Sequence, residues 1–120
     1  MVRILAVDDS PTMRRMVVAT LSAAGYSVQQ AADGCEALEI ARREAFDLVV
    51  LDINMPNMDG IQLIEQLRAL ESYKSVPLLV LTTEATAERK NQGRRAGATG
   101  WLVKPFNPEL LVSVVVKVLR

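Results

Sequence analysis

Side chains capable of chemistry follow four separate apolar runs of this sequence. They are three carboxylates, two hydroxyls and one ammonium, contributed by Asp8, Asp9, Asp52, Thr82, Thr83 and Lys104. If they meet, the carboxylates repel one another, because two like charges about 4 Å apart cost about 4 kcal/mol at an effective dielectric of 20. One lysine cannot balance three carboxylates, whereas a hard divalent cation can. All-oxygen ligation with few protein ligands suits Mg²⁺.

An aspartate in such a cluster can act as a nucleophile and form an aspartyl phosphate. The cation, a hydroxyl and an ammonium would then neutralise charge on the equatorial phosphoryl oxygens during in-line transfer. Neither G-x-x-x-x-G-K-[ST] nor G-x-G-x-x-G occurs in the sequence, which argues against nucleotide binding. The residues therefore favour phosphoryl transfer onto a carboxylate.

Alternating segment types must position these side chains. Short apolar runs predict strands at 2–8, 27–32, 46–53, 77–83 and 99–104. Longer amphipathic stretches predict helices at 11–24, 34–45, 60–71, 84–96 and 107–119. Helix N-caps are predicted at Ser10, Asp33, Asp59 and Asn107, and helix ends at Gly25 and Gly97.

Five such strand–helix units predict an α/β fold with a parallel sheet covered by helices on both faces. For five strands we expect the flavodoxin-like, doubly wound order 2-1-3-4-5, with segment 27–32 at an edge. The carboxyl ends of parallel strands share one edge of the sheet. Asp8, Asp52 and Lys104 are therefore expected to converge at one mouth, where such folds bind their ligands.

Composition excludes several functional classes. The 120 residues, half of them apolar, suit one domain over 1–120, and 14 basic residues balance 14 acidic ones. No excess positive charge is present to attract nucleic acid or an anionic membrane. The absence of histidine excludes a Ser-His-Asp triad and a histidine zinc site. A single cysteine, no apolar span and no signal peptide predict a cytoplasmic protein.

Four segments resemble the motifs of a response-regulator receiver domain. They are "AVDDSPTMRRM" (6–16), "LDINMPNMDG" (51–60), "LTTEA" (81–85) and "GATGWLVKPF" (97–106). They stand in the order found in that family, and the resemblance covers essentially the whole chain. "DDSPTMRR", "NMPNMDG" and "VKPF" are especially similar to the stand-alone chemotaxis regulators of the CheY type.

The resemblance implies a phosphoacceptor and a metal site. Asp52 would accept a phosphoryl group from a phosphohistidine on a separate, CheA-like histidine kinase. Asp9, Asp52 and the backbone carbonyl of Asn54 would bind one Mg²⁺ per domain, and Asp8 would act mainly through a metal-bound water. Lys104 would pair with the phosphoryl group.

The resemblance also implies tuning and switching roles. Thr82 would hydrogen-bond the phosphoryl group and move towards it on activation. Asn54 and Glu84 would set the rate of autodephosphorylation, with a phosphoryl lifetime of seconds to minutes. The Lys104–Pro105 peptide bond is expected to be cis.

Two residues depart from the family pattern. Trp101 stands where the family commonly has a Tyr or Phe switch residue. Indole is larger and donates only through its N–H, so its coupling to Thr82 is expected to differ. Thr83 occupies a position that is often small and is expected to crowd access to the phosphoryl site.

The last predicted helix carries more apolar residues than contact with one sheet face needs. In "PELLVSVVVKVL" eight of the twelve residues are apolar, and they sweep an arc of roughly 240°. The surplus predicts a partner surface shared with segment 84–96 and Trp101, with harmless surface valines as the alternative. The resemblance implies the same face, formed by helix 4, strand 5 and helix 5, and a flagellar motor switch protein as its partner.

Other polar residues are interpreted as structural. Cys35 is predicted to be a packing residue rather than a redox sensor. Arg14, Arg15 and the basic cluster at 88–95 are predicted to be solvated helix faces. The alternative is electrostatic contact with an acidic kinase or target.

The sequence is compatible with more than one function. The leading hypothesis is a phosphorylation-switched signalling monomer that catalyses only its own phosphorylation and dephosphorylation and is not a turnover enzyme. A small aspartate-nucleophile phosphatase would need a D-x-D pattern, but Ser10 occupies the second carboxylate position. A receiver-like scaffold that is never phosphorylated is disfavoured by the intact polar set. A phosphate sink, or a receiver trimmed from a longer regulator, remains an alternative, although the lack of a linker after the last helix favours a complete single-domain protein.

Overall fold

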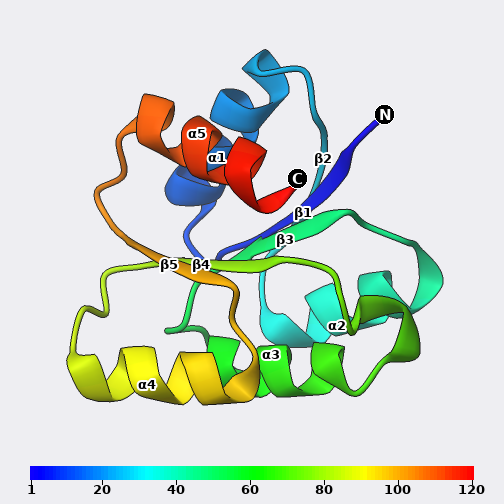
Figure 1. Cartoon of the computed structure of the whole chain (residues 1–120), viewed down its shortest axis with the longest axis vertical. Coiled ribbons are helices and arrows are strands. Elements are labelled where there is room, and N and C mark those ends of the chain that lie inside the picture. Colours follow the sequence, from blue (N-terminus) through cyan, green and yellow to red (C-terminus); the bar gives the residue numbers. More distant parts are fainter.

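The computed structural model describes residues 1–120 and shows five parallel strands with helices on both sides (Figure 1). The strands are β1 Arg3–Val7, β2 Ser27–Ala31, β3 Leu48–Leu51, β4 Leu78–Thr82 and β5 Gly100–Val103. They pair in the order β2-β1-β3-β4-β5. The predicted fold class and strand order are therefore confirmed.

The helices follow the strands as the sequence predicts. They are α1 Pro11–Ala23, α2 Gly34–Arg43, α3 Gly60–Arg68, α4 Ala87–Ala96 and α5 Pro108–Val118, with a short 3₁₀ turn, η1, at Glu71–Tyr73. Each predicted N-cap side chain accepts a backbone N–H from the first turn of its helix, which confirms Ser10, Asp33, Asp59 and Asn107. Beyond α1 and α4, Gly25 and Gly97 adopt φ values of 97° and 120°, which glycine reaches without a Cβ penalty.

Two hydrophobic clusters hold the helices against the sheet. α1 and α5 cover one face, and α2 and α3 lie on the other with α4 beside them (Figure 1). Alternate strand residues serve the two clusters: Leu5 and Val49 pack towards α2 and α3, whereas Ile4 and Val50 pack towards α1 and α5. Burial on both faces explains why β1, β3 and β4 appear in the sequence as continuous apolar runs.

Two predicted helix boundaries are wrong. The segment 84–96 becomes helical only at Ala87, because the Thr86 hydroxyl accepts the N–H of Arg89 and caps the helix there. Glu84 therefore lies in the β4–α4 loop. The segment 60–71 stops being helical after Arg68, since Leu70 is extended with φ −84° and ψ 128°.

The apolar residues of α5 that are not buried against the sheet lie on more than one side of the helix. Leu111 and Val115 are fully buried, whereas Leu110 and Val116 are 52% and 39% exposed. Val112 lines a hollow of about 500 Å³ together with Thr20 and Ala23 of α1. Part of the surplus thus lies towards α1, which corrects the prediction that all of it joins α4 and Trp101.

No helix in the structure is both long enough and apolar enough to cross a membrane.

Candidate functional site

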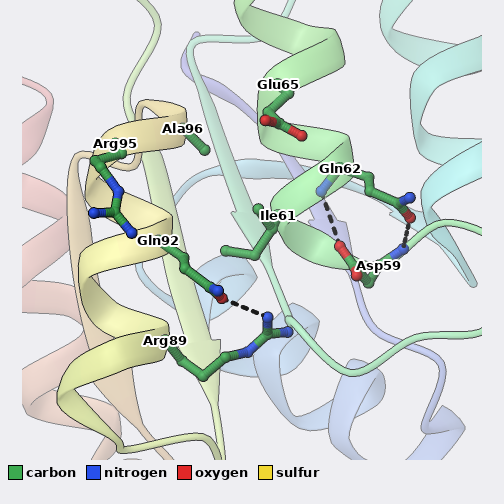
Figure 2. A pocket seen from close by; sticks show the side chains of 8 residues that line it. All are labelled: Asp59, Ile61, Gln62, Glu65, Arg89, Gln92, Arg95 and Ala96. Atoms are coloured by element: carbon green, nitrogen blue, oxygen red, sulfur yellow. Dashed lines mark hydrogen bonds between the residues drawn. The ribbon is translucent and has the colours of Figure 1, made fainter.

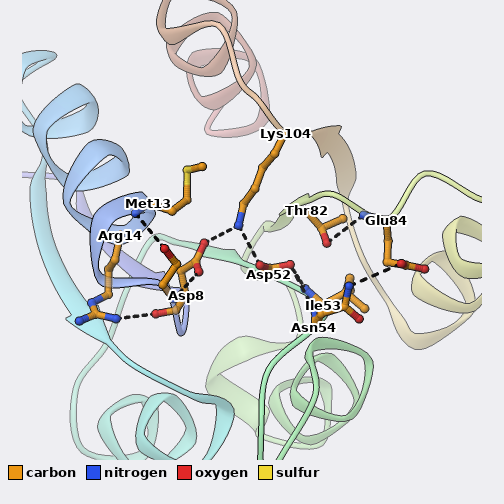
Figure 3. Close-up of polar contacts among 10 residues, drawn as sticks. Asp8, Met13, Arg14, Asp52, Ile53, Asn54, Thr82, Glu84 and Lys104 are labelled. Atoms are coloured by element: carbon orange, nitrogen blue, oxygen red, sulfur yellow. Dashed lines mark hydrogen bonds and ion pairs between the residues drawn. The ribbon is translucent and has the colours of Figure 1, made fainter.

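The carboxyl ends of β1, β3, β4 and β5 bring the predicted polar side chains to one edge of the sheet (Figure 3). Val7 and Leu51 are in register on β1 and β3. Asp8 and Asp52, which follow them, therefore end neighbouring strands. On the other side Thr82 pairs with Val103, so Lys104 begins where β5 ends. Parallel topology alone produces this convergence.

Lys104 bridges the two buried carboxylates. Its Nζ lies 2.7 Å from Asp8 Oδ2 and 2.8 Å from Asp52 Oδ2, and the three side chains are 7–9% exposed. Burial by itself lowers the pKa of the Lys104 amine. The hydrogen bonds and charges of Asp52 and Asp8 outweigh burial and raise the pKa above its usual value of 10.5. The amine is therefore held as an ammonium ion between the carboxylates.

Backbone N–H groups fix the orientation of both carboxylates. Asp52 Oδ1 accepts the N–H of Ile53 at 2.6 Å and lies 3.4 Å from that of Asn54. Asp8 Oδ1 accepts the N–H of Ser10 at 2.9 Å. The second oxygen of each carboxylate, Oδ2, is left to face Lys104 at the mouth of the site.

The carboxylate cluster fits a hard divalent cation. Ligand oxygens of Asp8, Asp9 and Asp52 lie within 4.8 Å of one another. Asp9 is exposed and takes no part in the ion pairs of Lys104 with Asp8 and Asp52. One ammonium thus faces three carboxylates, and the remaining negative charge and all-oxygen donor set are those that Mg²⁺ prefers.

Glu84, in the β4–α4 loop, connects the mouth of the site to the neighbouring elements through hydrogen bonds. Thr82 is fully buried, and its hydroxyl accepts the N–H of Glu84 at 3.3 Å. The Glu84 carboxylate lies 3.5 Å from Asn54 Nδ2, and its backbone carbonyl accepts the Trp101 indole N–H at 2.9 Å. Thr83, by contrast, is exposed. Glu84 is therefore in contact with the predicted hydroxyl, tuning and switch residues.

The Lys104–Pro105 peptide bond is cis, as the sequence resemblance implies.

Sequence reasoning missed Arg14. Its Nη1 donates to the Asp8 backbone carbonyl at 2.6 Å (Figure 3). Its Nε donates to Gln30 Oε1 at 3.1 Å. Its interpretation as a solvated residue is therefore wrong, whereas Arg15 is exposed as predicted. Its place in the sequence could have indicated this contact. Arg14 lies one helical turn after the Ser10 cap, and from there a long side chain can reach back to the end of β1.

Two further interpretations need correction. Cys35 is exposed rather than packed. Within the basic cluster at 88–95, Arg89 is half-buried, with its Nε 3.8 Å from Glu84 Oε1. The residues next to Cys35 and Arg89 in the sequence do not determine the exposure of these two side chains. That exposure depends on how each helix is oriented against the sheet.

A separate polar hollow of about 360 Å³ lies between α3 and α4 (Figure 2). Arg89 and Gln92 meet along its α4 side, with Nη1 2.7 Å from Oε1. It contains none of the carboxylates that surround Lys104. The chemistry of the predicted nucleophile therefore lies at the sheet edge rather than in this hollow.

Gly60 lets α3 begin directly against the backbone of Asp52. A Cβ at this position would collide with the Asp52 carbonyl oxygen and would lie 2.8 Å from Ile53 Cα. Both atoms belong to the backbone and cannot rotate away. Gly60 is therefore needed to keep the Asp52 turn in place.

Gly60→Ala is expected to lower the free energy of unfolding by about 3 kcal/mol, because overpacking displaces backbone rather than a flexible side chain. Urea unfolding measures the change. Gly25→Ala is the control, since a Cβ there meets nothing within 4 Å and incurs only the strain of positive φ, about 1 kcal/mol. Equal losses in the two variants would contradict the close contact at Asp52.

Comparisons with known proteins agree with this geometry. Residues 4–116 match the response regulator receiver domain family. Chemotaxis protein CheY-3 of Vibrio cholerae is 42% identical over 117 residues, which cover 97% of this chain and 90% of the relative. The structure of Vibrio cholerae chemotaxis protein CheY4 superimposes with a TM-score of 0.95 at 50% identity, covering 98% of both chains.

A third relative contains a metal. The receiver domain of the sensor histidine kinase PA1611 from Pseudomonas aeruginosa holds a magnesium ion coordinated in its active site cleft. It is 31% identical, with a TM-score of 0.91, and the match covers 98% of this chain and 96% of that one. Motif order, strand order, the acidic cluster and the family match over nearly the whole chain lead to one conclusion: this chain belongs to the response regulator receiver domain family of two-component signalling and is of the CheY-like type.

Proposed function

We propose that the protein is a phosphorylation-switched regulator that accepts a phosphoryl group on Asp52 from a phosphohistidine kinase. The observation that carries this proposal is the pairing of Lys104 with both Asp52 and Asp8, 2.8 Å and 2.7 Å away, at a mouth that also contains Asp9. This arrangement provides a nucleophile, a fixed positive charge and a set of oxygen ligands within one site. The reaction is self-catalysed and depends on Mg²⁺.

The three carboxylates of the cluster would have different roles in binding Mg²⁺. Asp9, Asp52 and the backbone carbonyl of Asn54 would hold Mg²⁺ directly, and Asp8 would contribute through a metal-bound water. Mg²⁺, when bound, supplies the positive charge that allows an anionic phosphoryl group to approach an anionic carboxylate. The magnesium ion in the PA1611 receiver supports this assignment.

Asp52 attacks with the oxygen that faces the mouth. A bond forms between that oxygen and phosphorus while the bond to the donor histidine nitrogen breaks, and the electron pair leaves with the imidazole. Lys104, which already contacts Asp52, then pairs with a phosphoryl oxygen, and the buried Thr82 hydroxyl donates to another. These positioned charges act where negative charge develops in the transition state. The absence of histidine in this chain fits a donor on a separate, CheA-like kinase.

Asn54 and Glu84 would tune hydrolysis of the acyl phosphate. Their side chains approach each other to 3.5 Å beside the acceptor loop. Their polar and charged groups therefore set the phosphoryl lifetime, while Thr83 limits access from the outer side.

The output surface is the α4–β5–α5 face. Val103 on β5 and Leu110 on α5 are 41% and 52% exposed. Lys90 and Arg94 of α4 line a hollow of about 350 Å³ beside Trp101. This combination of exposed apolar and basic groups suits a partner with acidic and apolar residues. We infer that the regulator acts as a cytoplasmic monomer in chemotaxis, with a motor switch protein as its target, in line with its chemotaxis relatives.

Acetyl phosphate with Mg²⁺ tests the proposed reaction without a kinase. We expect intact mass to show a single phosphoryl adduct that hydroxylamine removes, because hydroxylamine cleaves acyl phosphates. EDTA is expected to abolish the adduct. Formation of the same adduct in EDTA would contradict the role of Mg²⁺, and catalytic turnover of a phosphomonoester would favour a phosphatase instead.

A further inference from the structure

The indole of Trp101 is held at both ends. Its Nε1 donates to the Glu84 carbonyl at 2.9 Å, in the loop before α4. Its six-membered ring lies against Gly93 in the middle of α4, where a Cβ would be 2.6 Å from Cζ3 and 3.1 Å from Cε3. Trp101, like Ile61, also packs against the hydrophobic cluster under α2 and α3. The indole thus spans the space between the β4–α4 loop and the body of α4.

Gly93 is the only buried residue of α4. A glycine inside a helix is unfavourable relative to alanine, so its presence needs a packing reason. The contact with Trp101 provides that reason, because any side chain at position 93 would collide with the indole. Trp101 is larger than the Tyr or Phe usual in the family, and the facing helix has its smallest residue, Gly93, at the point of contact.

The same glycine disfavours the alternative orientation of the ring. If the indole turned out to solvent, the space beside Gly93 would hold no methyl group to fill it, and the hydrogen bond to the Glu84 carbonyl would be lost. An unfilled apolar space disfavours a state. Gly93 therefore permits the inward orientation and penalises the outward one.

We propose that Gly93 and Trp101 form a steric lock that keeps the indole inward before as well as after phosphorylation. The aromatic side chain then does not rotate as the protein is activated. The α4–β5 surface has its aromatic part preformed, and phosphorylation acts on it through Thr82 and the Glu84 loop. The behaviour of the ring on activation rests on the proposed function, whereas its resting orientation does not.

Acrylamide quenching of Trp101 fluorescence measures the orientation directly, because Trp101 is the only tryptophan. For the wild-type protein we expect the same Stern–Volmer constant with EDTA and with Mg²⁺ plus beryllium fluoride, a phosphoryl mimic. A constant that falls about twofold or more on activation would show that the resting indole lies outward, and would overturn the lock.

Gly93→Ala tests the lock in the unphosphorylated protein. Its methyl group is expected to displace the indole and raise the Stern–Volmer constant about twofold or more, with a red-shifted emission maximum. Asn91→Ala is the matched control: it also introduces alanine into α4, but at an exposed position. Equal constants in Gly93→Ala and wild type would overturn the role of Gly93.

Failure of the lock and failure of the proposed function give different results. Intact mass after acetyl phosphate treatment reports whether phosphorylation occurs at all. An adduct accompanied by a large change in quenching overturns the lock alone. Absence of an adduct overturns the proposed function, while the comparison of Gly93→Ala with wild type still decides the resting orientation.

Discussion

Lys104→Met is expected to lower the free energy of unfolding by about 3 kcal/mol at neutral pH in EDTA, because it removes one partner of a buried ion pair. Asp8 and Asp52 are 5% and 7% exposed as whole residues. In the variant both retain a backbone N–H donor but lose the ammonium. The loss stays at the lower end of the usual range because water reaches the mouth beside the exposed Asp9.

Added Mg²⁺ is expected to recover much of this loss. Without the lysine no fixed cation competes for the carboxylates, so Mg²⁺ stabilises the variant more than the wild type. Urea unfolding in EDTA and in excess Mg²⁺ measures both effects. Lys117→Met, at an exposed position of α5, is the control for removal of one positive charge. Equal stabilities of the two variants in EDTA would contradict the bridging role of Lys104.

The pH dependence of the free energy of unfolding follows from the same ion pair. The folded-state pKa of Lys104 is raised above its usual value of 10.5. Its contribution to stability is therefore fully present below that value and is lost as the pH rises through the raised folded-state pKa. Wild type is expected to lose stability in this alkaline range by a step that Lys104→Met lacks.

Asp9→Ala is expected to weaken Mg²⁺ binding by about 100-fold or more, because loss of a direct ligand exceeds the 10- to 100-fold effect typical of outer partners. The carboxylate of Asp9 is the exposed member of the acidic cluster. Asp8 and Asp52 keep their contacts with Lys104 in this variant. Isothermal titration with Mg²⁺ measures the affinity directly.

Glu65→Ala provides the matched control for Asp9→Ala. Glu65 is an exposed acid on α3, so its removal changes net charge equally without altering the cluster. Its Mg²⁺ affinity is expected to equal that of wild type. An Asp9→Ala variant that binds Mg²⁺ as tightly as Glu65→Ala would refute the ligand role of Asp9.

The sequence was sufficient to predict the fold and the convergence of the site, because both depend on regular geometry. Parallel strands must end at one edge, so the positions of Asp8, Asp52 and Lys104 in the sequence predicted their proximity. Helix caps such as Asp59 were equally predictable, since a cap depends on neighbours a few residues away.

Features that depend on contacts between distant segments were not predictable. The Arg14 bond to the Asp8 carbonyl depends on how α1 leaves the sheet. The start of α4 at Ala87 reflects competition between helix formation and the Thr86 cap. The sequence indicated that Trp101 departs from the family pattern, but only the facing Gly93 shows which orientation fits the ring. Close approach to a glycine cannot be read from spacing alone.

The identity of the phosphoacceptor is tested most directly by intact mass of wild type and Asp52→Asn after treatment with acetyl phosphate and Mg²⁺. Asparagine is nearly isosteric with aspartate but cannot form an acyl phosphate by this route. We predict one hydroxylamine-sensitive phosphoryl adduct on wild type and none on Asp52→Asn. An adduct of the same yield on Asp52→Asn, carried by Thr82 or Ser10 for example, would contradict it.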